Sequence, residues 1–360
     1  MLVTVRSLNR ATLDRQLLLQ RADLTALDAI EHLVGMQAQA PLAPYVGLWS
    51  RLVDFTPREL VDLLTQRSVV RASMMRVTVH LASAGDYRVL RPLLQPVMDR
   101  GFKGSPFAKE LAGLDLGAVL AAAEPLVAAG PVTRPALASA LSPLWPDRDA
   151  VSLAYAASYL LPMVQSLPRG VWGSNGPAAW QLASSWLGSP LDGSGSVDDL
   201  VLRYLAAFGP ATVADVQLWS GLTRLREVVE RLPLVQLTDE EGVVYHDLPD
   251  APRPSADVPA PPRFLPEYDN VLLSHADRRR FIPDARRVPL PPGTGATTGT
   301  VLVDGLWSAT WKTTRTPDSA ALTVAPHVPL ADADRAAVEH EAHALLAFTD
   351  PDLTPSVRVL

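Results

Sequence analysis

Apolar residues recur at helical spacing in the first part of the chain and then give way to an extended stretch. The pattern predicts helices over residues 10–21, 24–37 and 57–66. Residues 68–81 are rich in Val, Met and Thr and are predicted to be extended. Three helices followed by a strand pair are the element order of a winged helix, so the sequence predicts one such unit at the start of the chain.

A similar order returns twice further along. Gly130-Pro131-Val132-Thr133 and Gly209-Pro210-Ala211-Thr212 each precede a predicted helix that the threonine can cap. The second unit is expected to have helices from 134 and over 153–159, and a hairpin over 163–172. The third is expected to have helices over 197–208, 213–219 and up to 232, and strands at 234–237 and 243–246. Reuse of one supersecondary unit explains the match, although Gly-Pro turns before helices are also common in unrelated folds.

The last part of the chain changes to a strand pattern. Residues 250–263 are rich in proline and are predicted to form a stiff connector. Strands are expected at 271–274, 299–303, 309–312 and 321–324, and a helix at 331–348. Residues 289–300 are predicted to be a loop or hairpin tip that can probe a groove. The sequence therefore predicts an α+β protein with winged-helix units at 1–110, 111–190 and 191–250, and a β-rich domain with the connector and last helix at 251–360.

Composition narrows the class of protein. The chain has 360 residues, of which 48% are hydrophobic and 19% charged, so it is expected to be globular and multidomain rather than disordered. No run approaches the roughly 18 apolar residues of a membrane span, and the first residues carry charges where a signal peptide is apolar. We therefore expect a cytoplasmic protein without membrane contact. The absence of cysteine excludes disulfides, a thiolate nucleophile and sulfur-based zinc fingers.

The charge is acidic overall but unevenly placed. A net charge of −6 argues against a protein that simply coats nucleic acid. Five arginines nevertheless cluster within ten residues: Arg278, Arg279, Arg280, Arg286 and Arg287. A basic groove on an acidic body and a set of solvated surface arginines both agree with this pattern.

Several common chemistries lack support. His340 and His343 are spaced i, i+3 rather than i, i+4, with no third ligand nearby, so a solvated helix face is expected instead of a metal site. The chain has no Walker loop and no dinucleotide fingerprint after a predicted strand. Gly193-Ser194-Gly195 lies in a loop and not in a nucleophile elbow. Neither a metal nor another cofactor is expected.

The most informative segment is Gln37-Ala38-Gln39, which precedes Pro41. On a helix, side chains at i and i+2 diverge by about 200°, whereas in extended chain they project to the same side. Pro41 disfavours helical geometry at Ala40, so the helix is expected to end near Gln37 and both carboxamides can converge on one target. A carboxamide is no general base, but it can hold a water and a substrate in place.

Other polar residues admit two interpretations each. Arg71, Arg76 and His80 lie in the extended run and either line a phosphate path or are ordinary positions on a wing. Glu267 and Asp269 are carboxylates at alternate positions, and the second of them, Asp269, can activate a water. Asp269-Asn270 is also typical of a turn before a strand.

Six blocks of the sequence together resemble the AlkZ-like DNA glycosylases, a winged-helix family. The blocks are residues 9–21, 34–41, 75–81, 168–173, 264–280 and 301–305. The resemblance implies three tandem winged-helix units around a concave DNA-binding face and a C-terminal β-rich domain. The family signature is Gln-x-Gln, or Gln-x-Asp in a sister group, and the chain carries the first form at Gln37 and Gln39.

The resemblance also implies a reaction. A monofunctional glycosylase of this kind hydrolyses the N-glycosidic bond of N7-alkylated purines in double-stranded DNA. The implied setting is the unhooking of bulky adducts or interstrand crosslinks, in self-resistance to a genotoxic natural product. Gln39 is expected to orient the attacking water and Gln37 to hold it or the sugar, and the reverse assignment fits equally well. The arginines at 278–287 and the loop at 289–300 are the expected DNA contacts of a nucleoid-associated monomer.

Two alternatives belong to other classes. A winged-helix regulator or adduct sensor binds DNA without cutting it, but regulators usually have one such unit and a dimerisation element. A protein-interaction scaffold would agree with the acidic charge and disagree with the resemblance.

Overall fold

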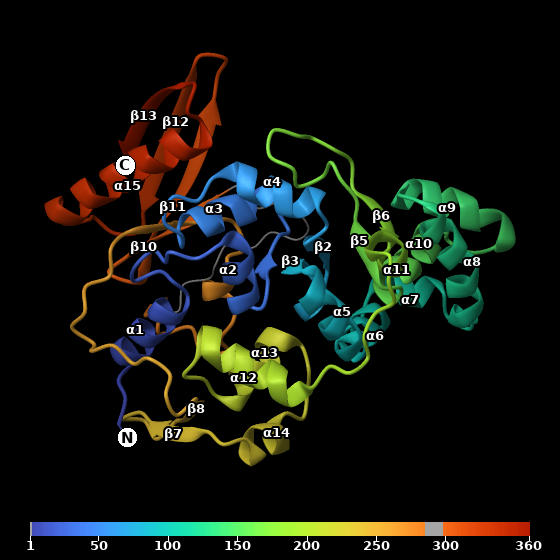
Figure 1. The fold of residues 1–360 in the computed structure, drawn as a ribbon, viewed down its shortest axis with the longest axis horizontal. Coiled ribbons are helices and arrows are strands. Elements are labelled where there is room, and N and C mark those ends of the chain that lie inside the picture. Colours follow the sequence, from blue (N-terminus) through green and yellow to red (C-terminus); the bar gives the residue numbers. More distant parts are fainter. Residues whose placement is uncertain (1, 285–297) are drawn as a thin grey trace.

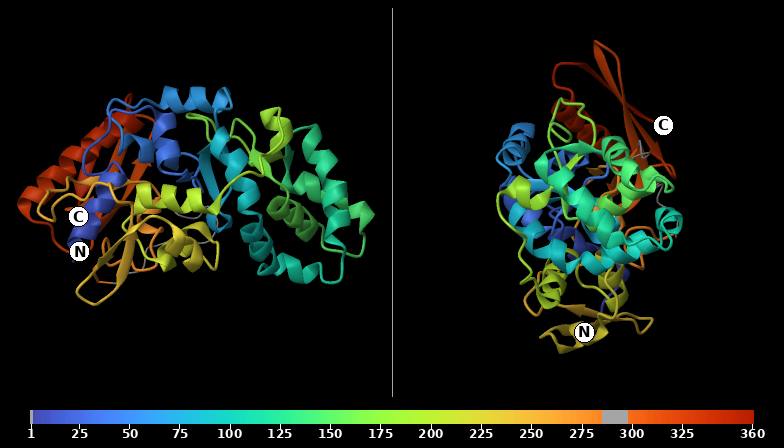
Figure 2. Two further views of the ribbon diagram at one scale, coloured as in Figure 1. Left: turned by 60° about the horizontal axis from the view of Figure 1, so that its bottom comes forward. Right: turned by 90° about the vertical axis from the view of Figure 1, so that its right-hand side faces the viewer.

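The computed structural model describes residues 2–284 and 298–360, and it confirms a mixed α/β protein with several sheets. The first part of the chain lies at the centre of an elongated molecule (Figure 1). Figure 2 shows the helices of the middle segment at one end and the C-terminal sheet at the other. None of the helices in the described residues combines the length and apolarity that crossing a bilayer requires.

The central part holds the candidate site. Its elements are α1 (Val5–Arg15), α2 (Ala26–His32), β1 (Met36–Gln37), α3 (Ala43–Trp49), α4 (Pro57–Thr65), β2 (Val69–Ser73), the 3-10 helix η1 (Met75–Val77) and β3 (Val79–Ser83). Helix α4 agrees with the sequence pattern, whereas the predicted extended run consists of two strands, β2 and β3, separated by the 3-10 turn η1. The pattern gave no sign of α3, because its seven residues are nearly all buried and show no periodic polar face.

The first two helices differ from the prediction, and local backbone geometry explains both differences. Helix α1 begins at Val5 because Thr4 and Ser7 form a capping box. It ends at Arg15, shortly before Leu17 turns to a positive φ of 58°. Helix α2 ends at His32, since Val34 and Gly35 take φ of 54° and 89° and the Gly35 N–H donates to the Ile30 carbonyl. The helix therefore stops well before Pro41, and Gln37 lies in a strand.

The middle segment, residues 84–187, adds helices and three strands to the sheet that contains β1, β2 and β3. Its elements are α5 (Ala84–Leu93), α6 (Gln95–Lys103), α7 (Pro106–Glu110), α8 (Leu116–Ala129), β4 (Val132–Thr133), α9 (Arg134–Leu141), η2 (Ser142–Leu144), α10 (Ala150–Leu160), β5 (Met163–Gln165), β6 (Ala179–Leu182) and α11 (Ala183–Leu187). A six-stranded sheet in the order β1-β3-β2-β5-β6-β4 runs through both parts. Strand β5 pairs with β6, so the connection after β5 is longer than the predicted 163–172 hairpin.

The next segment follows the predicted order closely. It comprises α12 (Val197–Phe208), α13 (Val213–Ser220), α14 (Arg226–Arg231), β7 (Val235–Thr238) and β8 (Val244–Asp247). Thr212 begins α13 with a capping box that includes Asp215. Tyr204, Phe208 and Trp219 stack within a core that also contains Val34 and Ala72 from the central part. This packing fixes the segment against the sheet that carries the candidate site.

The C-terminal part is a five-stranded sheet with one long helix. It comprises β9 (Arg263–Leu265), η3 (Asn270–Leu272), β10 (Gly299–Val303), β11 (Leu306–Arg315), β12 (Ser319–Pro326), α15 (Asp332–Thr349) and β13 (Thr354–Val359), with strand order β13-β12-β11-β10-β9. The strand expected at 271–274 is instead a 3-10 turn, because the Asp269 carboxylate caps the Val271 N–H. His340 and His343 are exposed on α15, and no cluster of metal-ligating side chains occurs in the described chain.

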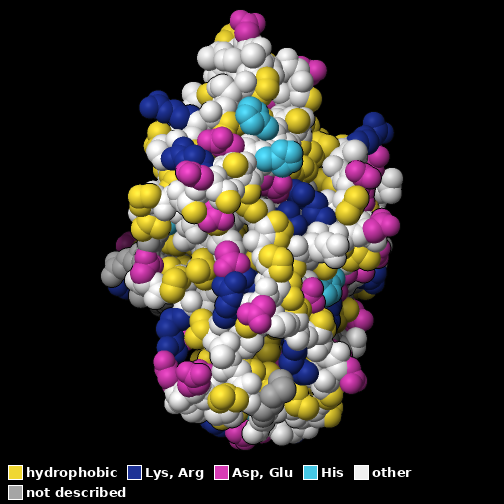
Figure 3. Space-filling view, turned by 90° about the vertical axis from the view of Figure 1, so that its left-hand side faces the viewer, with side chains coloured by type: hydrophobic (Ala, Val, Ile, Leu, Met, Phe, Trp, Pro, Cys, Tyr) yellow, Lys and Arg dark blue, Asp and Glu magenta, His cyan; other side chains and the backbone are white. Residues whose placement is uncertain are grey.

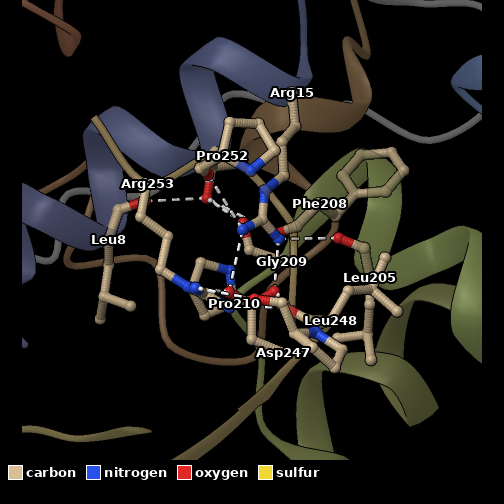
Figure 4. Close-up of polar contacts among 12 residues, drawn as sticks. Leu8, Arg15, Leu205, Phe208, Gly209, Pro210, Asp247, Leu248, Pro252 and Arg253 are labelled. Atoms are coloured by element: carbon tan, nitrogen blue, oxygen red, sulfur yellow. Dashed lines mark hydrogen bonds and ion pairs between the residues drawn. The ribbon is translucent and has the colours of Figure 1, made fainter. Parts of the chain in front are cut away.

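A buried ion pair joins four segments at one point (Figure 4). The Arg15 guanidinium of α1 donates to both carboxylate oxygens of Asp247 on β8, at 2.6 and 2.9 Å, and to the carbonyls of Leu205 and Pro252. Arg253 of the connector donates to the same carboxylate at 2.6 Å. The pair fixes the connector to the central part.

Candidate active site

Strand β1 brings both motif glutamines to β3. Gln37 lies directly opposite His80 in an antiparallel register, and the backbone N–H of Ala38 donates to the Val79 carbonyl at 2.7 Å. The Gln39 side-chain oxygen accepts from the Val79 N–H at 3.3 Å. Gln37 is 7% exposed and Gln39 is half-buried. The Gln37 backbone therefore lies opposite His80, and the Gln39 carboxamide is bonded to Val79, the preceding residue of β3.

Arg76 orients the Gln37 carboxamide. Its Nη2 donates to Gln37 Oε1 at 2.8 Å and to Asn270 Oδ1 at 3.0 Å, while Nη1 donates to the Trp219 carbonyl at 3.0 Å. Because a guanidinium only donates, Gln37 must present its oxygen to Arg76 and its NH₂ group elsewhere. The Val79 N–H fixes the Gln39 amide in the same way. Among the residues that the structure describes, neither NH₂ group donates a hydrogen bond, and each oxygen keeps a second lone pair.

The backbone at Arg76 is unusual. Arg76 and Val77 have φ of 56° and 62°, a left-handed conformation that side chains rarely adopt. Burial lowers the pKa of Arg76 to about 10, with a further contribution from Arg278, so the guanidinium stays charged at neutral pH. Three of its five N–H groups donate to Gln37, Asn270 and the Trp219 carbonyl. We therefore assign Arg76 a positioning role, which the sequence did not indicate because the contact depends on that turn.

His80 is fully buried beside Gln37 and is held in one tautomer. Its Nδ1 lies 2.9 Å from the Thr78 carbonyl, so Nδ1 carries the hydrogen and Nε2 is an acceptor. Burial, and then the charge of Arg76, lower the pKa of His80 to about 3. The imidazole is therefore neutral at physiological pH, and its burial argues against a phosphate contact.

This burial predicts a pH dependence of stability. In the unfolded chain the His80 imidazole is protonated below its ordinary pKa, whereas in the folded protein it stays neutral down to about pH 3. Because the unfolded state binds the additional proton, the free energy of unfolding falls as the pH falls. Between pH about 7 and about 5, His80 should lower the free energy of unfolding by about 2 kcal/mol. Urea unfolding of wild type and His80→Asn at both pH values measures this difference. Identical pH dependence in the two proteins would show that His80 does not titrate in this way.

Arg71 supports the motif from the opposite face of the sheet. It is 2% exposed and donates to the Ala38 carbonyl at 2.8 Å, the Pro41 carbonyl at 2.7 Å and Gln165 Oε1 at 3.1 Å. Burial lowers its pKa to about 10. A Cβ at Gly170 would lie 2.7 Å from the Arg71 side chain, so a glycine is needed there. These bonds fix the turn after Gln39 and use three of the five guanidinium N–H groups in the protein interior.

Replacing Arg71 by lysine tests this positioning role. A lysine keeps the charge, but it lacks the planar guanidinium that lets Arg71 donate to three separate acceptors at once. For the base excision that the sequence resemblance implies, we expect the rate to fall about tenfold or more, since small displacements of reacting groups are costly, with little change in DNA affinity. Single-turnover kinetics beside equilibrium DNA binding separate the two. A loss of affinity with an unchanged rate would instead indicate a phosphate contact.

Asp269 lies next to Gln37 in a shared cavity. Its carboxylate accepts two hydrogen bonds from Arg51, each at 2.9 Å, in a buried ion pair. A small cavity of about 10 Å³ has apolar residues such as Leu33 and Phe208 in its lining together with five polar ones: Gln37, Asp269, Asn270, Arg51 and Gln16. Its volume corresponds to about one water molecule, and its lining is polar enough to bind one. The structure thus brings the candidate carboxylate and the first glutamine to one water-sized site.

The arginine cluster separates into different roles. Arg279 is paired with Asp277 and Glu241, and Arg280 is buried and donates to Thr12 Oγ1 and the Pro210 carbonyl. Arg278 is half-buried, and it has no ion pair within the described residues. Arg286, Arg287 and most of the loop at 289–300 lie outside the described residues. On the face in Figure 3, basic and acidic side chains are interspersed.

Comparison with known proteins identifies the class. The sequence model of the family described as DNA glycosylase AlkZ-like matches residues 30–348. The molecule is therefore an enzyme of the DNA glycosylase class, acting in DNA repair. The chain belongs to the AlkZ-like DNA glycosylase family, as the sequence blocks predicted.

The solved structures agree on the fold. DNA glycosylase AlkZ from Streptomyces sahachiroi superposes with a TM-score of 0.71 over 100% of both chains, at 18% sequence identity. A sequence search of curated proteins finds no match. The mixed α/β fold is thereby confirmed, while the division into three winged-helix units and its boundaries stay predictions.

Proposed function

We propose that the enzyme hydrolyses the N-glycosidic bond of N7-alkylated purines in double-stranded DNA, with Gln37 and Gln39 as the catalytic pair. The observation that carries this proposal is the fixed orientation of Gln37 by Arg76, beside a cavity that fits one water. Arg76 and Arg71 are positioning residues in this account. No metal or other cofactor enters the reaction we propose.

The chemistry suits a pair of amides. An N7-alkylated guanine already carries a positive charge and leaves as a neutral base, so no general acid is needed. The enzyme then has to place a water and stabilise an oxocarbenium-like sugar. Gln37 borders the water-sized cavity together with Asp269, and Gln39 does not. We therefore assign Gln37 to the attacking water and Gln39 to the sugar, with Asp269 polarising the same water and accepting the proton that it loses when the new C–O bond forms.

A substrate panel tests the proposed specificity. Duplexes with a single N7-methylguanine, a single N3-methyladenine or only normal bases are incubated with excess enzyme, and the released bases are identified by mass spectrometry. We expect release of N7-methylguanine and none from the normal duplex. Binding without release from any duplex would favour a DNA-binding adduct sensor. A bulkier N7 adduct and an N7 crosslink in the same panel test whether the enzyme acts in self-resistance to a genotoxic natural product.

Neighbouring arginines provide a test of the DNA interface. Arg278 has no ion pair in the described chain, whereas Arg279 is held by two carboxylates. If Arg278 neutralises one phosphate, Arg278→Ala should reduce the slope of log K against log salt by about 0.9. Arg279→Ala should change it little. Fluorescence anisotropy over a salt series measures both slopes, and equal slopes for Arg278→Ala and wild type would remove Arg278 from the interface.

We also propose that the wild-type protein is a monomer, which sedimentation experiments can test.

A further inference from the structure

A second cavity opens directly beyond the motif and is much larger than the water-sized one. Its volume is about 400 Å³, within the range of small-molecule sites, roughly 300–1,000 Å³. Among the described residues, four parts of the chain line it: residues 40–46, the connection between β5 and β6, the C-terminal sheet with the segment after β9, and Thr349 at the end of α15. Figure 1 shows these parts in blue, green and orange to red. Ala40 lines the cavity and is the residue directly after Gln39.

Two indole rings form part of the wall. Trp172 packs on Tyr45, with ring centroids 4.8 Å apart, and on Phe348 at 5.6 Å. Trp311 is held by a hydrogen bond from Nε1 to the Leu265 carbonyl at 2.9 Å. Both rings are therefore fixed before any ligand arrives. Fixed indoles at a cavity wall favour a planar ligand, and their faces attract positive charge.

Glu267 is the acidic group of this cavity. It is largely buried, and among the described residues its carboxyl group has only its own backbone N–H as a hydrogen-bond partner. Burial raises its pKa. A buried carboxyl with a single local hydrogen bond is costly when ionised, and a ligand with N–H donors and positive charge would satisfy its remaining lone pairs. The carboxyl and the indoles thus select the same kind of ligand.

The rim of the cavity has the opposite charge. Lys312 is exposed, Arg169 is half-buried, and Arg315 is exposed but held by Asp350. Cationic side chains around an opening suit the phosphate groups of a nucleotide. The cavity therefore combines a rim for phosphates with an interior for a planar, cationic ring.

We propose that this cavity receives an N7-alkylguanine nucleotide turned out of the duplex, with the base between Glu267 and the indoles and its phosphates at Lys312 and Arg169. The N1–H and exocyclic amino group of guanine are the donors for the Glu267 carboxylate. The N7-alkyl group supplies the positive charge that unmodified guanine lacks. With the base inside, the glycosidic bond would lie at the opening next to Gln39. The inference rests on the proposed function and names the substrate subsite of that same reaction.

Nucleotide binding tests the subsite without catalysis. The full-length protein is titrated by calorimetry, at mildly acidic pH, with 7-methylguanosine monophosphate and with guanosine monophosphate. We expect the methylated nucleotide to bind about tenfold more tightly, as a desolvated cation beside aromatic rings implies. Glu267→Gln should lose most of this preference, while Lys312→Gln should lower the affinity for both nucleotides to the same extent. Glu240→Gln, an exposed carboxylate elsewhere, should behave as wild type. Thermal melting of each variant confirms that it folds.

Two results would overturn the subsite. Equal binding of the two nucleotides by wild type would show that the cavity does not sense the N7 charge. A preference that persists in Glu267→Gln would place the sensing elsewhere. Failure of the proposed function is a separate result: the nucleotide preference would be present, but N7-methylguanine would not be released from the duplex.

Discussion

Replacing Gln37 by alanine is expected to lower the excision of N7-methylguanine by about 10²- to 10³-fold, the effect of removing one preorganised polar group from an active site. The reason is the geometry around its carboxamide. Arg76 holds Gln37 Oε1 at 2.8 Å, and the side chain borders a cavity for one water. Without the amide, this water loses a donor and an acceptor, whereas the DNA loses no phosphate contact. Single-turnover excision measures the change.

The control for this prediction is another glutamine. Gln236 lies exposed on β7, so Gln236→Ala should excise at the wild-type rate. The Gln37→Ala enzyme should also keep its affinity for damaged duplex within a few fold. An unchanged rate for Gln37→Ala would remove this residue from the catalytic assignment and leave Gln39 to be tested alone.

Replacing Asp247 by asparagine is expected to destabilise the fold by about 3–5 kcal/mol. The Arg15 and Asp247 side chains are 1% and 0% exposed, so neutralising the carboxylate leaves a buried guanidinium without its counterion. Four segments meet at this pair, including the C-terminal end of α12 and the proline-rich connector. Urea unfolding of the two proteins gives the difference directly.

An exposed ion pair is the matched control. Asp62 pairs with Arg58 on the surface of α4, with side-chain exposures of 41% and 81%. Asp62→Asn removes the same charge and should cost less than about 1 kcal/mol, because such pairs are screened by solvent. Similar losses for the two substitutions would contradict the importance given to the buried pair.

The sequence predicted best where its signals are local. The helices and strands from Val197 to Asp247 agree with the structure because caps, turns and alternating apolar positions all lie within a few residues of each other. The prediction was less accurate around α2. Pro41 predicts a helix end near Gln37, but the Val34-Gly35 turn ends the helix already at His32. A positive φ at a valine has no signature in the sequence.

The candidate site depends mostly on contacts that are distant in the chain. Gln37 and Gln39 could be proposed from their spacing and from the family resemblance. Arg76 and Asp269 were also candidates, but the contacts around Gln37 could not be predicted, because Arg76 reaches it across a left-handed turn and Asn270 comes from the C-terminal part. The arginine cluster shows the same limit. Charge alone could not distinguish buried Arg280 from half-buried Arg278.

In the reaction we propose, the amide pair of Gln37 and Gln39 performs the hydrolysis of the N-glycosidic bond. The most direct test is single-turnover release of N7-methylguanine from a labelled duplex by wild type and by the Gln37→Ala, Gln39→Ala double variant, with binding of the same duplex measured in parallel. We predict that the double variant releases almost no N7-methylguanine but still binds the duplex. Full release by the double variant would contradict it.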